Sequence, residues 1–279
     1  MTIKIVTDST ADLPPELAKE QDISVVPLYL RFGQEVFRDM VDIDQDEFYR
    51  RLTQGNVHPS TAQPSPQDFS DVYKKLGKEA DGILSIHLTG KLSGTCNAAL
   101  RGKEIADVKC PIEVIDSEVV TMGLGQLAIA ANALAKAGKN LQQIAKEVKQ
   151  MIPTIHMMGL LDTLKFVSLG GRIGKLQAML GSVLNIKPLI KIKDGVLAPA
   201  GRARSRAKGI DELFSFVKNT PEIQDISVVY STTLEEAKAL VKRLGEIYDE
   251  AQITLARLGP VLGVHGGPGT LLVSLRGKE

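Results

Sequence analysis

The chain has 279 residues, and 34 Lys and Arg side chains nearly balance 33 Asp and Glu, for a formal net charge of +1. With 43% apolar and 24% charged residues, it has the composition of a folded globular protein rather than a disordered one. The balanced charge gives no basis for a nucleic-acid-binding surface or for a surface that binds anionic membranes.

Several further classes are unexpected from the sequence. The first ten residues, MTIKIVTDST, form a strand pattern without the basic and apolar regions of a signal peptide. No stretch has the roughly 18 uncharged apolar residues of a membrane span. Cys96 and Cys110 match no disulfide framework, which favours a reducing cytoplasm. The four histidines lie far apart, so we expect neither a metal site nor a bound cofactor.

The first half of the chain alternates strand and helix patterns. We predict strands over 4–8, 23–28, 82–86 and 112–116, and a hairpin over 29–37. Helices are predicted from Asp12, over 44–53, from Ser65, over 93–106 and from residue 141, whereas the Pro-rich segment 59–66 is predicted to be a loop. Alternation of this kind indicates crossover connections and a parallel sheet.

The pattern changes after Pro153. Predicted strands over 186–193 and 196–203 flank Asp194-Gly195, which is typical of a type I′ hairpin. Helices over 206–218 and 234–247 and strands over 226–230, 253–257, 261–264 and 271–275 complete the chain. We therefore predict an α/β protein of two domains. Residues 1–155 form an N-terminal α/β domain with a parallel sheet, and residues 156–279 form a C-terminal α+β domain with a mainly antiparallel sheet.

Three glycine-containing segments resemble catalytic motifs but lack essential residues. Residues 170–176, GGRIGKL, end in Leu176 where a phosphate-binding loop needs Ser or Thr. Residues 265–269, HGGPG, resemble a hydrolase oxyanion loop, but the chain has no Gly-x-Ser-x-Gly elbow. Residues 90–94 place the first glycine one position too far from Ser93 for that elbow. Neither a nucleotide-binding loop nor a serine hydrolase is therefore expected.

Hydroxyl side chains follow two predicted strands of the parallel sheet. Residues 8–10, Asp-Ser-Thr, end the first strand, and Ser93, Gly94 and Thr95 open a helix beyond the strand 82–86. The carboxyl edge of such a sheet is a common ligand site, and amide groups at a helix start favour an anion. Ser93 can also be read as an ordinary helix cap.

Other candidates have equally plausible structural interpretations. Arg172 could be a solvated arginine at a helix end, and a lone His265 is more often structural than ligand-binding. Met157, Met158 and Met179 could wall an irregular aliphatic cavity, although core packing is the more common role of each.

Seven motifs occur in one order along the chain. They are VTDSTADL (6–13), STAQPS (60–65), LSGT (92–95), IDS (115–117), GGRI (170–173), IKP (186–188) and GVHGGPG (263–269). Together they resemble the DegV family of bacterial fatty-acid-binding proteins, and the resemblance spans residues 3–277.

The resemblance implies a fold that holds a long-chain fatty acid, such as palmitate, in a tunnel between two domains. Carried over by motif, Thr61 and Ser93 bind the carboxylate, while Gly94, Arg172 and His265 lie close by. No catalytic residue and no cofactor other than this ligand are implied.

Some family members are the lipid-binding subunit of a bacterial fatty acid kinase, whose separate ATP-binding subunit forms the acyl-phosphate. In this chain Arg202, Arg204 and Arg206 would form the docking surface for that partner, and membrane contact would be only transient, for lipid exchange. Two departures, Ala62 where many members have Ser and Cys96 where an aromatic is common nearby, could alter which acyl chain fits.

Two other functions stay open. The family fold is related to that of dihydroxyacetone kinases, whose substrate domain uses a histidine. The chain could therefore be a stand-alone enzyme that acts on a small keto or phosphorylated substrate through His265. It could also be a regulatory interaction protein that retains lipid. The residues alone do not fix the acyl chain length or the oligomeric state.

Overall fold

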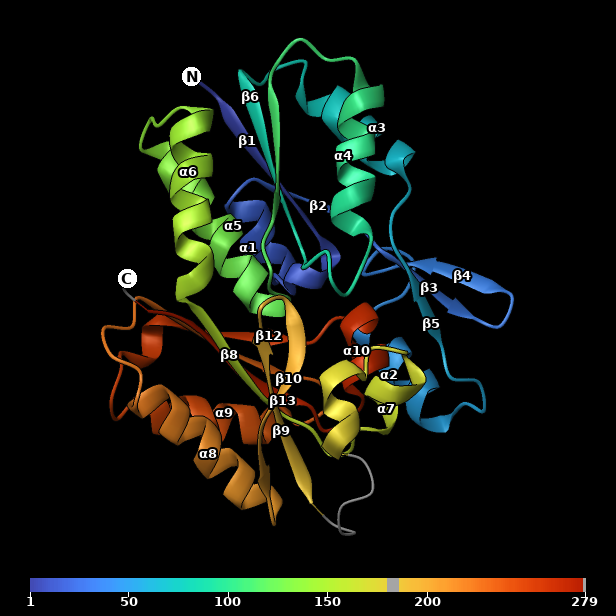
Figure 1. Ribbon diagram of the computed structural model, residues 1–279, viewed down its shortest axis with the longest axis vertical. Helices are drawn as coiled ribbons and strands as arrows, with labels where there is room; N and C mark the ends of the chain where they lie inside the picture. Colours follow the sequence, from blue (N-terminus) through green and yellow to red (C-terminus); the bar gives the residue numbers. More distant parts are fainter. Residues whose placement is uncertain (180–185, 278–279) are drawn as a thin grey trace.

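The computed structural model describes residues 1–179 and 186–277, and its two lobes are each built on a separate β-sheet (Figure 1). Within these residues the first sheet contains β1 (Ile3–Asp8), β2 (Ile23–Val26), β6 (Gly82–His87) and β7 (Ile112–Asp116) in the order β2-β1-β6-β7, and all its strands are parallel. Its helices are α1 (Pro15–Glu20), α3 (Pro66–Leu76), α4 (Thr95–Ala106), α5 (Thr121–Lys136) and α6 (Leu141–Met151).

The second sheet is mainly antiparallel. It contains β8 (Ile155–Leu160), β9 (Lys187–Lys193), β10 (Val196–Ala203), β11 (Asp225–Tyr230), β12 (Ile253–Arg257) and β13 (Leu271–Arg276) in the order β10-β9-β8-β13-β11-β12. Only the β11–β12 pair is parallel among these described strands. Helices α8 (Arg206–Lys218) and α9 (Leu234–Leu244) pack on this sheet. The predicted fold class is confirmed in both lobes.

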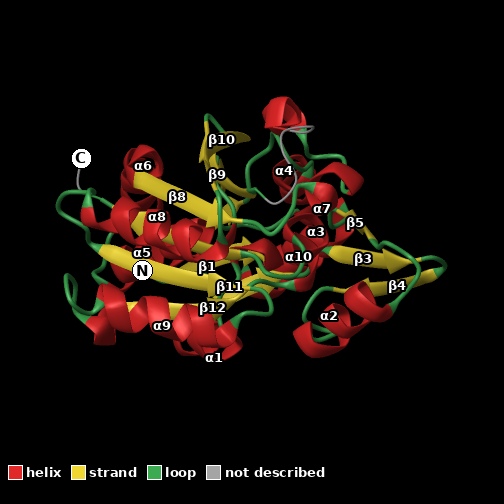
Figure 2. Cartoon of the chain, turned by 90° about the horizontal axis from the view of Figure 1, so that it is seen from below, coloured by secondary structure: helices red, strands yellow, loops and turns green. Residues whose placement is uncertain are grey.

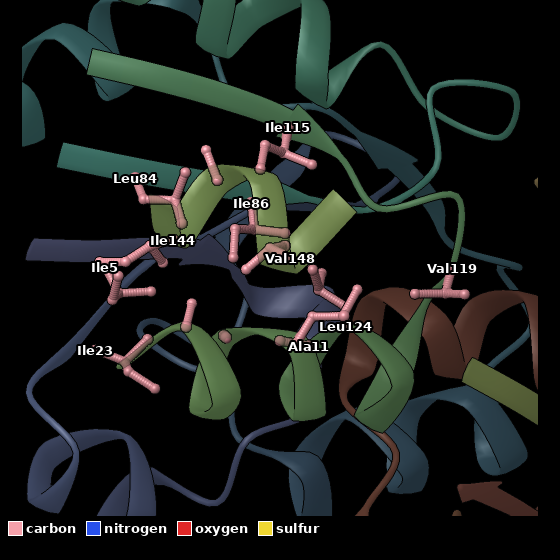
Figure 3. Close-up of a cluster of buried hydrophobic side chains, with 14 of the residues drawn as sticks. Ile5, Ala11, Ile23, Leu84, Ile86, Ile115, Val119, Leu124, Ile144 and Val148 are labelled. Atoms are coloured by element: carbon pink, nitrogen blue, oxygen red, sulfur yellow. The ribbon is translucent and has the colours of Figure 1, made fainter. Parts of the chain in front are cut away.

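Helices cover both faces of the parallel sheet, because successive strand residues point to opposite sides. Ile5 packs with α5 and α6, whereas its neighbour Val6 packs with α3 and α4. The same alternation separates Leu84 from Ile83 on the central strand β6. Figure 3 shows the first of these cores, with Ile5, Leu84 and Ile86 of the strands facing Leu124 of α5.

Helix α5, which the sequence patterns do not predict, lies between the two sheets. Residues on one side of it join the core of the parallel sheet, and Met122 joins Val229 and Leu272 of the second sheet. A helix that is apolar on all sides is typical of complete burial. Gly123 allows this close packing, since a Cβ there would stand only 3.0 Å from Ile155 Cγ2.

The β9–β10 hairpin has the predicted turn. Asp194 and Gly195 have φ angles of +52° and +71°, and positive φ at both central residues is the signature of a type I′ turn.

A small third sheet lies beside the lobes. It pairs β3 (Tyr29–Phe32) with β4 (Glu35–Arg38) and with β5 (Ser60–Ala62), all antiparallel. Figure 2 shows β3 and β4 with α2 (Gln45–Gln54) at one end of the molecule and α10 (Pro260–Gly266) between them and the main body. The prediction that segment 59–66 is entirely a loop is therefore wrong, because residues 60–62 pair along β3.

The strand predicted over 261–264 is also wrong, because these residues belong to α10. Pro260 occupies the first turn of this helix, where its missing N–H removes no hydrogen bond. Val261 and Val264 pack against Phe48 of α2, so tertiary contacts outweigh their strand propensity.

The chain passes from the first lobe to the second where α6 ends. A short 3-10 helix (Ile152–Thr154) leads directly into β8. A division near residue 155 stays a prediction, because α2 and β3 of the first half share a core with α10 of the second. Within the described residues, no helix combines the length and apolar character needed to cross a membrane.

Candidate ligand-binding site

A cavity of about 370 Å³ lies between the two lobes. This volume is within the range of about 300–1,000 Å³ that is usual for small-molecule sites. Most of its wall is aliphatic, from Leu28, Leu88, Leu92, Val120, Met157, Leu161, Val167, Ile190, Ile192, Leu197, Leu258, Val261, Leu262 and Leu272. No Asp or Glu is among its described lining residues.

The cavity brings together all five ligand-site residues that the sequence motifs indicate. Thr61 lies on β5, Ser93 and Gly94 lie in the loop before α4, and His265 lies on α10. Arg172 follows α7 (Lys165–Leu169), in the segment that resembles a phosphate-binding loop. Segments up to 204 residues apart in sequence therefore form a polar end in an otherwise aliphatic cavity.

Thr61 and His265 contact each other directly. The Thr61 hydroxyl and His265 Nε2 share a hydrogen bond of 3.2 Å, and His265 Nδ1 has no partner among the described residues. The pKa of His265 is lowered to about 4, mainly by burial and to a smaller extent by charge repulsion from Arg172 and His58. The ring is therefore neutral near pH 7. A Cβ at Gly170 would stand 2.1 Å from Nδ1, so this glycine leaves room for the imidazole.

Arg172 supplies the positive charge of the polar end. Its Nε donates to the Leu92 carbonyl at 3.3 Å, and its NH1 donates to the Gly170 carbonyl at 2.7 Å. Among the described residues it forms no ion pair, so its charge faces the cavity without a carboxylate partner. A buried or half-buried arginine usually has an anionic partner.

Ser93 lies one residue before the helix cap. Gly94 is the N-cap of α4, and the Ser93 hydroxyl shares a hydrogen bond of 2.9 Å with the Thr95 hydroxyl. Its bond from the Thr95 N–H is long, at 3.4 Å, so capping is a weak part of its role. Gly94 lines the cavity and is also packed closely by Gln63, because a Cβ there would stand 2.0 Å from Gln63 Oε1.

The loop that carries Ser93 is held from both lobes. In the first lobe, Asp8 Oδ2 accepts from the Leu88 N–H at 3.1 Å, and Asp116 Oδ2 accepts from the Gly90 N–H at 3.0 Å. From the second lobe, the turn of the β9–β10 hairpin provides two acceptors. Its Gly195 carbonyl accepts from the Thr89 hydroxyl at 2.8 Å, and its Asp194 carbonyl accepts from Lys91 Nζ at 2.7 Å. This loop is therefore fixed before any ligand binds.

Some lining residues are missed by the sequence analysis. Gln63 lines the cavity and packs on Gly94, although its place in the motif STAQPS (60–65) does not mark it as a ligand-site residue. Thr121 lines the cavity with a φ of +49°, which is rare for a β-branched residue, and nothing in the sequence signals this conformation. Of the three methionines near the predicted boundary, Met157 lines the cavity, while Met158 and Met179 pack in separate cores.

The three arginines of the predicted docking surface differ in their surroundings. Arg202 and Arg204 are exposed on and just after β10. Arg206 instead forms ion pairs with Glu236 at 2.7 Å and Asp162 at 3.4 Å, and its side chain is only 18% exposed. The cost of breaking these partly buried contacts argues against Arg206 as a docking residue.

The arrangement suits an amphiphile with an anionic head. The polar end offers one guanidinium, two hydroxyls and a neutral imidazole. The rest of the wall is mostly aliphatic and also includes Gln63, Thr121, Lys191 and Thr270. No group of three or more His, Cys, Asp or Glu side chains suited to a metal ion occurs in the described parts of the chain.

Fold and site together define a class: a two-sheet α/β protein with a mainly aliphatic cavity between its lobes. The family model described as uncharacterised protein, DegV family COG1307, matches residues 2–278. A DegV domain-containing protein of Deinococcus radiodurans is 35% identical over 280 residues, which cover 99% of this chain and 98% of the relative. The chain belongs to the DegV family, as the motifs predict.

Two solved structures resemble the whole chain. A DegV family protein from Thermus thermophilus, described by its fatty acid binding, has a TM-score of 0.91 at 33% identity and 100% coverage of both chains. DegV of Bacillus subtilis, a fatty acid binding protein, has a TM-score of 0.91 at 30% identity, again with 100% coverage of both chains.

Proposed function

We propose that this protein binds one long-chain fatty acid in the cavity between its lobes. The carboxylate lies against Arg172, Thr61 and Ser93, and the acyl chain follows the aliphatic wall. The observation that carries the proposal is the guanidinium of Arg172, which has no carboxylate partner within the described chain and stands in a cavity whose described lining contains no Asp or Glu. The fatty acid binding of the Thermus and Bacillus relatives supports the same ligand class.

The physical chemistry of the cavity fits this ligand. Burying a CH₂ group contributes about 0.8 kcal/mol, so a long acyl chain supplies most of the binding free energy. A buried carboxylate needs charge-assisted donors in return for lost hydration, and the guanidinium and two hydroxyls are such donors. A neutral His265 can bond to Thr61 without adding or removing charge.

We further propose that the protein is a non-catalytic carrier that presents its fatty acid to other proteins. The partner is an ATP-binding fatty acid kinase subunit that forms the acyl-phosphate, as the family resemblance implies. Exposed Arg202 and Arg204 are the remaining candidates for its docking surface. The proposal also includes a cytoplasmic location and only transient membrane contact during lipid exchange.

The alternative of a stand-alone enzyme depends on His265. The neutral ring could in principle accept a proton or bond a carbonyl, but it is already bonded to Thr61 and faces an aliphatic cavity. A small keto or phosphorylated substrate would leave that wall unfilled. Turnover of such a substrate by the isolated chain, lost in His265→Ala, would favour this alternative.

The deciding experiment is identification of the lipid that co-purifies with the protein from a bacterial host. We expect denaturing mass spectrometry to find about one fatty acid per chain. In delipidated protein, Ser93→Ala should weaken palmitate binding, whereas Ser168→Ala, outside the cavity lining, should not. Stoichiometric sugar or nucleotide in place of fatty acid would contradict the proposal.

A further inference from the structure

Two aspartates outside the cavity lining lie where α10 begins. Gly259 is the N-cap of α10, and its N–H donates to Asp12 Oδ1 at 2.8 Å. Asp39, which directly follows β4, approaches the same residue. A Cβ built on Gly259 would stand 2.8 Å from Asp12 Oδ1 and 3.9 Å from Asp39 Oδ2. Two carboxyl groups thus meet at the start of the helix that carries His265.

Their environment disfavours a negative charge. Asp12 is 7% exposed and Asp39 is 1% exposed, and neither forms an ion pair among the described residues. Asp12 Oδ2 and both carboxyl oxygens of Asp39 have no hydrogen-bond partner among those residues. The donors nearby offset this burial only in part: Thr121 and the Gly259 N–H lower the pKa of Asp12, and Ser9 and the Val261 N–H lower that of Asp39, but burial is the larger effect on both.

The charged and titratable groups around the pair do not compensate. The pKa of Asp12 is raised to about 8 and that of Asp39 to about 7, mainly by burial, and the charge of Asp8 at the end of β1 contributes to both shifts. From α2, the Tyr49 hydroxyl donates to the Leu258 carbonyl at 3.1 Å, and burial raises its pKa well above 10. From β12, Arg257 is ion-paired with Asp46 at 2.7 Å.

The pair separates the ligand cavity from a second cleft. Asp12 and Asp39 line an outer cleft of about 420 Å³ between the lobes, which Gly259 also lines. Leu258, the residue before Gly259, lines the ligand cavity. Thr121, whose hydroxyl lowers the pKa of Asp12, lines the ligand cavity as well. The outer cleft gives the two carboxyl groups a route for proton exchange with solvent.

We propose that Asp12 and Asp39 are positioning residues for α10, uncharged while the cavity is closed, and that proton loss from this pair displaces the start of α10 and weakens fatty acid binding. The inference rests on the proposed fatty-acid function. It adds a proton-dependent control of ligand release to the same site, because α10 carries Val261, Leu262 and His265 of the cavity wall.

The direction of the pH effect follows from linkage. Both groups titrate in the folded protein above their ordinary value of 3.8, so the folded state holds protons that the unfolded state has released. Their contribution to stability is complete below about pH 4 and is lost as the pH rises through about 7 and 8. Affinity for the fatty acid should fall over the upper part of the same range.

The test measures laurate affinity of the delipidated full chain at pH 6.5 and pH 8.5. We expect a loss of about tenfold in the unmodified protein, equivalent to one pKa unit of linkage. Asp39→Asn and Asp12→Asn should each reduce that loss to about twofold, because an amide keeps the shape and does not titrate. Asp42→Asn is the matched control: Asp42 is paired with Arg38 at the surface and should keep the full pH dependence.

Each outcome supports or overturns the proposal. Equal affinity of the unmodified protein at both pH values, or the same tenfold loss in both Asn variants, would overturn it. If an Asn variant fails to fold, methyl NMR of Val261 in the unmodified chain replaces it: a shift with a midpoint between pH 7 and 8 supports the proposal, and an unchanged signal overturns it. Absence of laurate binding at either pH would instead overturn the proposed function itself.

Discussion

The polar end and the aliphatic wall of the cavity have different roles in ligand binding. The polar end has few groups, each held by bonds from elsewhere in the fold, such as Arg172 on the Leu92 and Gly170 carbonyls. The aliphatic wall has many side chains, and each offers only a part of the apolar contact. The comparison teaches that affinity comes mainly from the wall and ligand orientation mainly from the polar end. The three predictions below test this division, from the largest expected effect to the smallest.

The length of the acyl chain should have the largest effect. Laurate has four CH₂ groups fewer than palmitate, and at about 0.8 kcal/mol each this is about 3 kcal/mol, or on the order of 200-fold in Kd. Calorimetric titration of delipidated protein with both acids, each kept monomeric, measures the difference. Equal affinities would mean that the wall contributes little and that the division is wrong.

Removing the charge of the polar end should have an intermediate effect. Arg172→Gln should weaken palmitate binding by about 2 kcal/mol, or roughly 30-fold, because a charge-assisted hydrogen bond is lost. The same variant should leave the affinity for hexadecanol nearly unchanged, since that ligand has no charge. Arg204→Gln, at an exposed arginine, is the control. An equal loss for the alcohol and the acid would show that Arg172 shapes the wall instead.

Removing one hydroxyl should have the smallest effect. Thr61→Val keeps the side-chain shape and removes one neutral hydrogen bond, so palmitate affinity should fall by about 1 kcal/mol, or roughly fivefold. Thr53→Val is the control, because among the described residues the Thr53 hydroxyl bonds only backbone carbonyls of α2.

NMR titration should find His265 neutral down to about pH 5 in the unmodified protein, in line with its pKa of about 4. A His265 pKa near 6.5 would contradict the burial of the ring.

Local sequence patterns predict the fold where one face of an element is polar or where a turn has strict requirements. The Asp194-Gly195 turn is such a case, as is the predicted start of α3 at Ser65, where Ser65 and Asp68 form a capping box. Helix α5 escapes prediction because its first eight residues are all buried, so its sequence shows no alternation of apolar and polar faces. Helix α10 escapes because its apolar sequence has no local preference that outweighs tertiary contacts.

The candidate site is recovered from the sequence only through its motifs. They indicate Thr61, Ser93 and Arg172, but no spacing rule joins residues on three distant segments. The family resemblance leads us to group Arg206 with Arg202 and Arg204 as docking residues, although the Arg206 side chain is ion-paired with Glu236 and Asp162. The left-handed conformation of Thr121 depends on packing at the junction of the lobes, so no local signal predicts it.

The position of α5 between the two sheets affects how the protein unfolds. Helix α5 contributes side chains to the core of the parallel sheet and to a core on the second sheet, so both lobes depend on it for part of their hydrophobic packing. A fragment that ends near residue 155 would leave Met122 and Ile129 without the strands that cover them. Heating should therefore melt the protein as a single cooperative unit, even though its outline suggests two bodies.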